Sequence, residues 1–181
     1  MFNIFGEKAE NQFSWNDIKN VSEGRKNLGE CMPVLIYRLF EYTLKDELIR
    51  RYGKQETIDI FRKAGALAGK EFALHLLDVA LPFNAFIAQV QEKLEIHKMG
   101  ILRVEETDEE LRKIVLTISE DLDCSGLPIM GESVCNYDEG FIAGILEAYT
   151  QANYYVEEID CWGTGARVCR FRALLKQIES V

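Results

Sequence analysis

The sequence predicts an α+β domain in which N-terminal helices pack on an antiparallel sheet made of two β-hairpins. Two patterns carry this prediction. Over residues 32–99, apolar side chains recur at three- and four-residue spacing, as in helices that bury one face. Beyond Gly100, apolar and polar residues alternate instead, and the alternating segments come in pairs separated by short turns, which is typical of β-hairpins.

Three helices are expected before the sheet. The first covers 32–52 and is ended by Gly53, the second covers 57–77, and the third follows Pro82, a residue that suits a first helical turn. Within the second helix, residues 64–69 read AGALAG. Small residues four apart let another backbone approach closely, and we expect tight packing there to offset the low helix propensity of glycine, which costs about 1 kcal/mol per residue.

The predicted sheet has four strands, at 101–106, 112–120, 154–160 and 168–174. A helix over about 137–150 separates the two hairpins, and its Gly140 and Gly144 repeat the four-residue spacing of small residues. Residues 163–168 begin like a dinucleotide-binding loop. They link two strands and do not open a helix, so we interpret them as a hairpin turn.

The chain is expected to form one domain. Residues 1–30 show no sustained period and are interpreted as an arm or lead-in, whereas residues 31–181 suffice for a single hydrophobic core. The formal net charge of −9 opposes binding to nucleic acid, so we expect no nucleic-acid partner. Neither an export signal nor a run of about eighteen apolar residues is present, which favours a cytoplasmic protein without a membrane span.

Five cysteines without an export signal favour metal ligation, redox chemistry or simple burial over a disulfide framework. Cys161 and Cys169 flank the turn of the second hairpin, so strand pairing brings their sulfurs close together. Glu158 precedes this turn and Cys135 opens the 137–150 helix, so all four side chains can converge. Three thiolates and one carboxylate suit a structural zinc. On spacing alone, burial of these cysteines as small apolar residues is supported about equally well.

The two remaining cysteines have weaker interpretations. Cys124 lies in a loop with Gly and Pro residues and is either a spare ligand or a reactive thiol. Cys31 is interpreted as a packing residue.

A resemblance favours the metal. Residues 133–173 contain a cysteine that opens a Gly-x-x-x-Gly helix, an acidic strand, then Cys, a Gly-rich turn and Val-Cys-Arg-Phe. This pattern resembles the 4-vinyl reductase (hydrocarbon-binding) domain family, and weaker similarity extends through 63–71 and 25–29. In the phenol- and toluene-responsive activators that carry this domain, zinc is held by Cys, Glu, Cys and Cys at these spacings. The resemblance therefore implies, as zinc ligands, Cys135, Glu158, Cys161 and Cys169.

The family is similar in fold to TRAPP-type vesicle-tethering subunits and, more distantly, to haem nitric-oxide sensors, and its members bind small hydrophobic molecules. The resemblance thus implies a sensing domain, stabilised by zinc, that reports ligand occupancy through contacts in a homodimer or with a regulatory protein partner. The family's phenol sensors use a Trp and a His in the pocket. Here Trp15 and Trp162 fall outside the corresponding segment, so phenol is not the expected ligand.

The expected pocket lies between the helices and the sheet. Its predicted lining residues are Phe72, His75, Phe83, Phe86, Ile87, Val90, Ile114 and Leu116. By their spacing alone these residues are ordinary core, and a histidine on a helix is more often structural than ligand-binding.

Two other functions remain open. The family name suggests an enzyme that reduces vinyl groups of tetrapyrroles, but no nucleotide fingerprint or acid/base pair supports it, and no catalytic residue is assigned. A non-catalytic scaffold subunit, with apolar helices packed against a partner, is the third interpretation. In all three cases we expect a homodimer, because the small residues at 64–69 allow close pairing of helices.

Overall fold

The computed structural model describes residues 13–176, which fall into two compact units, one up to Tyr37 and one from Arg38 onward. The first unit contains a 3-10 turn, η1 (Trp15–Asp17), and a short helix, α1 (Val21–Gly24). The side chain of Ser14 caps η1 by accepting the N–H of Asn16 at 3.3 Å. Most of the predicted arm that is described therefore has local structure of its own.

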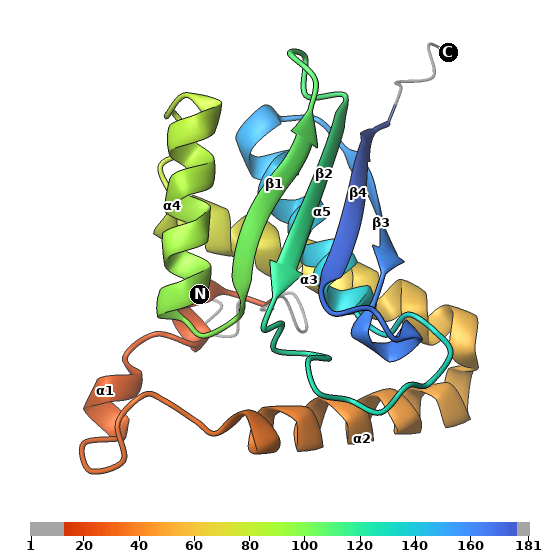
Figure 1. The fold of residues 1–181 in the computed structure, drawn as a ribbon. Helices are drawn as coiled ribbons and strands as arrows, with labels where there is room; N and C mark the ends of the chain where they lie inside the picture. The colour runs from red at the N-terminus through yellow and green to blue at the C-terminus, as the bar shows by residue number, and fades with distance from the viewer. Residues whose placement is uncertain (1–12, 177–181) are drawn as a thin grey trace, which may run out of the picture. The chain divides into compact units, whose positions relative to one another are not determined.

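The second unit, in which helix α2 continues past Tyr37, contains the helices and strands that the sequence predicts (Figure 1). The helices are α2 (Val34–Tyr52), α3 (Lys54–Leu76), α4 (Phe83–Ile96) and α5 (Asn136–Thr150). The strands are β1 (Ile101–Thr107), β2 (Lys113–Ser119), β3 (Tyr154–Asp160) and β4 (Cys169–Leu175), with a short turn η2 (Trp162–Thr164) between β3 and β4. The predicted α+β class and the two hairpins are confirmed.

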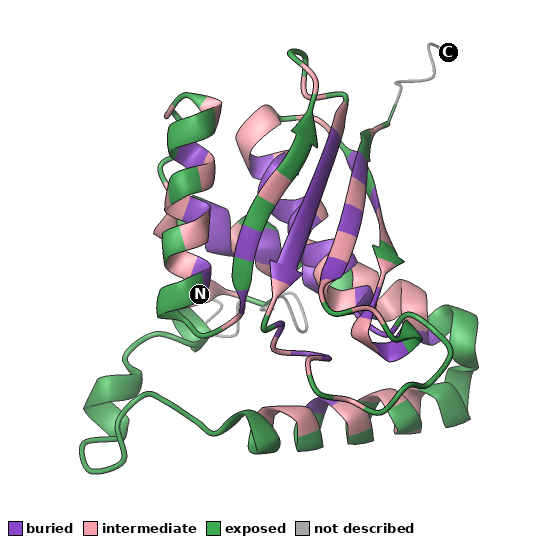
Figure 2. Cartoon of the chain, viewed as in Figure 1, coloured by how far each residue is buried: buried purple, intermediate pink, exposed green. Residues whose placement is uncertain are grey.

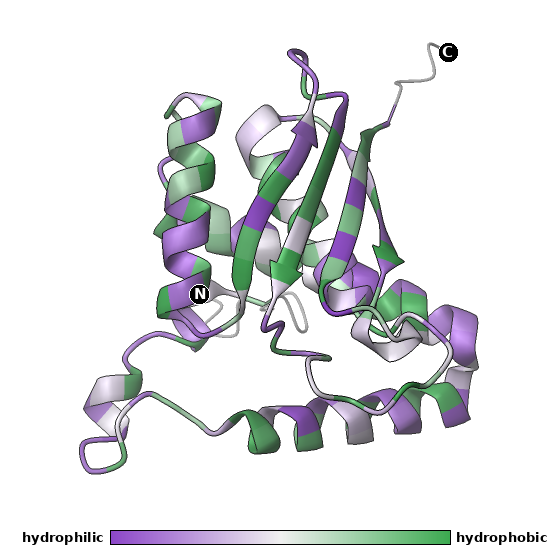
Figure 3. Ribbon diagram, in the orientation of Figure 1, coloured by the Kyte–Doolittle hydropathy of each residue, from purple (hydrophilic) through white to green (hydrophobic). Residues whose placement is uncertain are grey.

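The four strands form one antiparallel sheet in the order β1-β2-β4-β3, so the two hairpins join along β2 and β4. Opposite each other in this register are Leu116 and Phe171, and Ile118 and Cys169. β2 is buried along most of its length (Figure 2). Its residues are mostly apolar, whereas apolar and polar residues alternate along β1 and β4 (Figure 3). The pairing places Cys169 on the same buried face as Phe171.

Helices cover one face of this sheet. α5 packs against β3 and β4, α4 packs against β1, and α3 lies against α5 on its far side (Figure 1). On the sheet's other face, cross-strand ion pairs join Arg170 to Glu105 at 2.7 Å and Arg172 to Glu157 at 2.8 Å. The core therefore lies between the sheet and the helices, where the apolar side chains of both meet.

The contact between α3 and α5 is a backbone crossing that glycine makes possible. A Cβ atom on Gly69 would lie 2.0 Å from the carbonyl oxygen of Phe141, and one on Gly144 would lie 2.1 Å from that of Ala66. Gly65 and Gly140 are equally close to the facing helix. The small residues at 64–69 thus pack against α5 of the same chain. The expectation that they pair with a second copy of the chain was therefore wrong.

We expect Gly69→Ala to lower the free energy of unfolding by about 3 kcal/mol or more, because the added methyl group meets a backbone oxygen that cannot move without shifting α5. Gly24→Ala is the matched control, since a Cβ on Gly24 meets nothing within 4 Å. Urea denaturation followed by circular dichroism measures both. A loss below about 1 kcal/mol for Gly69→Ala would contradict the crossing.

Candidate metal centre

Four of the five cysteines meet at one end of the sheet. Cys124 lies in the loop after β2, Cys135 caps the N-terminus of α5, Cys161 follows β3 and Cys169 begins β4. All four are at most 1% exposed. The fifth cysteine, Cys31, is exposed. Segments far apart in the sequence therefore deliver four thiols to one buried place.

The spacing of these sulfurs suits a tetrahedral ion. One sulfur from each cysteine lies within 4.8 Å of the others. The Sγ of Cys135 is 3.9 Å from that of Cys161 and 3.8 Å from that of Cys169, whereas Cys124 and Cys169 are 3.0 Å apart. Four sulfurs bound at about 2.3 Å to a tetrahedral zinc lie about 3.8 Å from one another. The four cysteines can therefore hold a metal ion with little adjustment.

Without an ion, the cluster concentrates negative charge on one sulfur. The pKa of the Cys161 thiol is lowered because the thiols of Cys124, Cys135 and Cys169 hydrogen-bond to it. The N–H of Gly163 also donates to Cys161 Sγ at 3.3 Å. The same sulfur contacts raise the pKa of Cys135. A bound cation would remove this competition by allowing all four thiols to ionise.

Glu158, the predicted carboxylate ligand, lies beside the sulfurs. Its Oε2 accepts the N–H of Cys135 at 3.3 Å, and its Oε1 is buried without a hydrogen-bond partner among the described residues. Burial, followed by the charge of Cys161, raises the pKa of Glu158 to about 8. The structure thus brings three predicted ligands together with Cys124, and leaves Glu158 next to them. Ligation by Glu158 remains a prediction.

A buried carboxylate that the sequence reasoning missed supports this arrangement. Glu139 accepts hydrogen bonds from Arg62 Nε at 2.6 Å, from the backbone N–H of Glu158 at 2.9 Å and from Asn136 Nδ2 at 3.3 Å. It therefore ties α3, the start of α5 and β3 together next to the sulfurs. Its position in the first turn of the Gly-x-x-x-Gly helix was the only sequence signal, and that signal is shared with Asp138.

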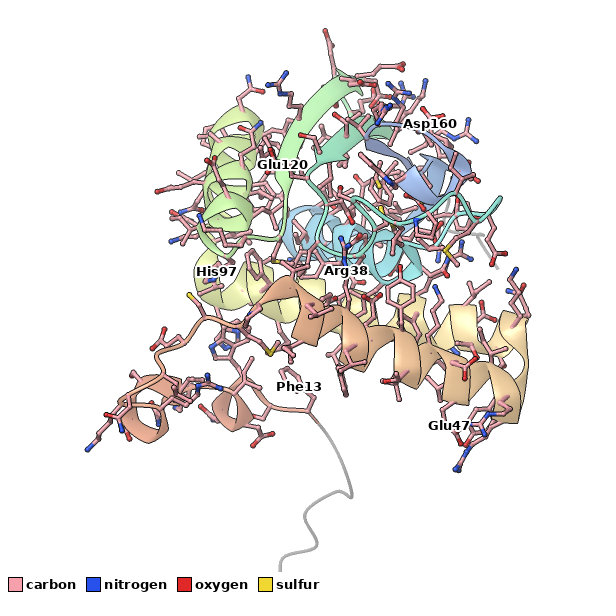
Figure 4. All side chains as sticks on the ribbon, turned by 60° about the horizontal axis from the view of Figure 1, so that its bottom comes forward. Phe13, Arg38, Glu47, His97, Glu120 and Asp160 are labelled. Carbon is pink, nitrogen blue, oxygen red and sulfur yellow. The ribbon has the colours of Figure 1, made fainter. Side chains whose placement is uncertain are left out.

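Further carboxyl groups lie on the other side of Cys135. Oxygens of Asp121 and Asp138 are within 4.8 Å of each other and of Cys135 Sγ. Nearby, Arg38 donates to the backbone carbonyls of Leu122 at 2.7 Å and Asp121 at 3.3 Å, reaching from α2 toward the loop after β2 (Figure 4). The arginine therefore fixes the loop by its backbone and does not pair with these carboxylates.

Seven of the eight predicted pocket residues belong to the core between helices and sheet or pack against it, and His75 does not. Phe86 stacks on Tyr149 with ring centroids 4.2 Å apart, and Phe72 contacts Phe141 edge-on at 5.3 Å. Five are buried, namely Phe72, Phe86, Val90, Ile114 and Leu116; two, Phe83 and Ile87, are half-buried, and His75 is exposed. Their role in ligand binding remains a prediction.

A cavity of about 200 Å³ lies elsewhere, between α2, the start of α3 and the segment before α5. Tyr42, Lys45 and Ile49 line it from α2, and Thr57 and Ile58 line it from α3. Asp46 of α2, Lys54 of α3 and residues of the 130–136 segment form the remaining wall. Lys45 Nζ donates to the carbonyl of Val134 at 2.8 Å and to Asn136 Oδ1 at 3.2 Å, the residues on either side of Cys135. The cavity therefore adjoins the cysteine cluster through the backbone.

No helix within residues 13–176 combines the length and apolarity needed to cross a lipid bilayer.

The elements from β2 to β4, which carry all four buried cysteines, correspond to a known family. Residues 114–175 match the model of the 4-vinyl reductase domain. This match confirms the resemblance to that family that the sequence indicates.

Two curated relatives from Methanocaldococcus jannaschii share part of the chain. The uncharacterized protein MJ1642 is 37% identical over 79 residues, which cover 44% of this chain and 47% of the relative. MJ0150, also uncharacterized, is 26% identical over 103 residues, which cover 57% and 58% of the two chains. The matches thus span about half the length of these relatives.

Solved structures share the fold at low identity. A vinyl-4-reductase family protein from M. jannaschii superposes with a TM-score of 0.59 at 17% identity, covering 83% of this chain and 85% of its own. The phenol-responsive sensory domain of the transcription activator PoxR, with phenol, superposes with a TM-score of 0.63 at 13% identity, covering 81% of this chain and 76% of that domain. Trafficking protein particle complex subunit 3 from Naegleria fowleri, covalently bound to palmitic acid, superposes with a TM-score of 0.63 at 16% identity, covering 80% of this chain and 95% of that subunit. The predicted TRAPP-like fold is confirmed.

The buried carboxyl of Glu41 on α2 makes the stability of the metal-free protein depend on pH. Burial, then the charges of Asp123 and Asp121, raise its pKa from 4.5 to about 8, despite opposing effects of Lys45 and Arg38. Between these values the folded state holds a proton that the unfolded state has lost, so stability falls as the pH rises.

We therefore expect Glu41→Gln, measured with a chelator present, to unfold at higher urea concentration than the native protein at pH 8, with a gain in the free energy of unfolding of about 4 kcal/mol at most. The gain should vanish near pH 4.5. Glu92→Gln, at an exposed position of α4, is the control. An equal effect of Glu41→Gln at both pH values would contradict this explanation.

Proposed function

We propose that this chain is a non-catalytic domain that binds a small hydrophobic molecule and signals its presence, with a structural zinc held by the four buried cysteines. The observation that carries the proposal is the convergence of Cys124, Cys135, Cys161 and Cys169 within the segment that matches the 4-vinyl reductase domain. Two proteins of the same fold hold apolar molecules, since PoxR is described with phenol and the trafficking subunit with palmitic acid.

The donor chemistry favours zinc with a structural role. Zinc prefers tetrahedral sites with thiolate ligands, and a closed shell of four protein ligands leaves no position for a reacting water. Such an ion would fasten the loop after β2, the start of α5 and the hairpin of β3 and β4 to one another. In this proposed ligand set Cys124 takes the place of Glu158. Glu158 is then a neighbour of the ion's ligands and accepts the N–H of Cys135.

For the ligand, the cavity beside Cys135 is the better of two places. The predicted pocket residues mostly belong to the filled core, where Phe86 stacks on Tyr149 and Phe72 contacts Phe141, whereas the cavity between α2 and α3 offers about 200 Å³. Apolar walls from Ile49, Ile58 and Val134 would receive an apolar body, and Tyr42 and Lys45 stand where a polar end could bind. Because Lys45 holds Val134 and Asn136, occupancy would shift the residues that flank Cys135.

Helix α2 would transmit ligand occupancy of the cavity to a partner. Its apolar residues Leu39, Phe40 and Leu44 are 59%, 66% and 41% exposed, which is unusual for large apolar side chains on one helix. The same helix lines the cavity with Tyr42 and Lys45. A second copy of the chain, or a regulatory protein, that covers this surface would therefore respond to what the cavity contains.

If the four thiols bind zinc, Cys124→Ser should lower zinc affinity by more than about 100-fold, whereas Glu158→Gln should lower it by about 10-fold, as expected for a group outside the ligand shell. Competition with a chromophoric chelator measures both. Cys31→Ser, at an exposed cysteine, is the control and should bind zinc like the native protein. The reverse order would show that Glu158, and not Cys124, is the fourth ligand.

Filling the cavity should abolish ligand binding without unfolding the protein. Ile58→Phe enlarges a half-buried side chain that lines the cavity, and Ile60→Phe makes the same change at a half-buried position of α3 that does not line it. Titration calorimetry against monocyclic aromatics and medium-chain fatty acids should detect binding to the native protein and to Ile60→Phe, and at least a tenfold loss in Ile58→Phe. Binding that Ile58→Phe leaves unchanged would place the ligand elsewhere.

A further inference from the structure

Next to the cysteine cluster lies a group of carboxylates whose burial the zinc site does not explain. Asp121 is 2% exposed and Glu41 is 7% exposed. Glu41 Oε2 and Asp138 Oδ2 are both buried and accept no hydrogen bond from any described residue. An unpaired buried carboxylate costs several kcal/mol, so such groups are normally paired with a cation or coordinate a metal.

The nearby basic side chains do not supply that pairing. Arg38 donates to backbone carbonyls of the loop after β2, and Lys45 donates to the carbonyl of Val134 and to Asn136 Oδ1. Within the described part of the chain, no ion pair of 4.0 Å or less includes Glu41, Asp121 or Asp138.

Two of these carboxylates, those of Asp121 and Asp138, lie close to the sulfur of Cys135. One oxygen from each of Asp121 and Asp138 and the sulfur of Cys135 lie within 4.8 Å of one another. Asp121 is held in place because its Oδ1 accepts the N–H groups of Asp123 at 2.9 Å and Cys124 at 3.0 Å. Asp138 is fixed in the first turn of α5. Glu41 lies on α2 next to Tyr42, whose hydroxyl donates to the backbone carbonyl of Asp123 at 3.1 Å.

We propose that Asp121, Asp138 and Cys135 bind a second divalent cation, beside the zinc of the four cysteines, with the sulfur of Cys135 bridging the two ions. The proposal rests on the zinc site proposed above, because Cys135 belongs to both sets. The three donor atoms lie within 4.8 Å of one another, and the buried Oδ2 of Asp138 accepts no hydrogen bond from any described residue.

The donor set indicates which ion binds. A mixture of carboxylate oxygens and one thiolate suits a borderline ion such as zinc better than magnesium or calcium, which take oxygen ligands alone. Three protein donors would leave one tetrahedral position, and the unpartnered Oε2 of Glu41 or a water molecule can occupy it. This second ion, unlike the first, therefore has an exchangeable ligand.

A proton shared between Asp121 and Asp138 is the competing explanation, because two adjacent carboxyl groups can lower their repulsion by holding one proton between them. The two explanations differ in what happens when Asp138 becomes an amide. With a shared proton, Asp138→Asn would be at least as stable as the native protein whether or not zinc is present. With a second ion, Asp138→Asn would lose part of the stabilisation that zinc provides.

The test counts metal ions per chain. Metal-free native protein is titrated with Co²⁺, whose sulfur-to-metal absorption reports thiolate ligation, and the zinc-loaded protein is analysed by mass spectrometry under native conditions. We expect two ions per chain, with intense absorption from the first and a small increase from the second. Asp138→Asn should keep the first ion with its absorption and lose the second.

Asp121→Asn is the second variant, since its amide oxygen can still accept the N–H groups of Asp123 and Cys124 while the charge is lost. It too should bind one ion. Glu147→Gln, farther along α5, is the control and should bind two. One ion in the native protein, or two ions in both Asp variants, would overturn the second site and leave the zinc site intact. No ion at all would overturn both.

Discussion

The close crossing of α3 and α5 fixes the position of Cys135, and the rest of the centre depends on that position. Glycines on both helices let their backbones touch, so α5 cannot slide or tilt without a clash. Cys135 caps the N-terminus of this helix, and Glu139, one turn later, binds Arg62 of α3 and the backbone of β3. The helix pair thus holds one sulfur against those of Cys161 and Cys169 in the second hairpin and of Cys124 in the loop after β2.

Strand pairing brings two of these sulfurs, those of Cys161 and Cys169, together. Cys169 and Ile118 are opposite each other where β2 and β4 join, and Cys161 lies across the hairpin turn. A register irregularity between Glu158 and Asp160 adds a residue to β3. Residues 154, 156 and 158 face the core before this point, which explains why Glu158 reaches the cluster while Asp160 pairs with Arg170 on the outer face.

The features that could be predicted from the sequence are those that depend on periodicity and on local chemistry. Alternation located the strands, glycine spacing marked two segments of close backbone approach without showing that they meet each other, and the hairpin turn brought Cys161 near Cys169. Cys124 could not be assigned in the same way, because the loop between β2 and α5 has no period and its course depends on contacts such as that of Arg38 with Leu122.

Periodicity also could not tell a filled core from a cavity wall. It places Phe86 in the interior correctly, but only the structure shows that Tyr149 occupies the space beside it. Of the carboxylates, Glu158 was reached through the family resemblance, whereas Asp121, Asp138 and Glu139 gave no signal distinct from ordinary surface acids. The burial of Asp121 and Glu139 results from tertiary packing, which local sequence does not encode.

A zinc ion with four thiolate ligands cannot itself respond to a ligand, since its shell is closed and its geometry is fixed. Any response must come from groups around it that have two arrangements available. Under the proposed function Lys45 would be that group, because it donates to the residues flanking Cys135 and also lines the cavity. A ligand that takes over one of its hydrogen bonds would loosen the start of α5 and, through the same helix turn, the exposed apolar side chains of α2. Under the proposed function, the metal would be the fixed point against which α2 moves.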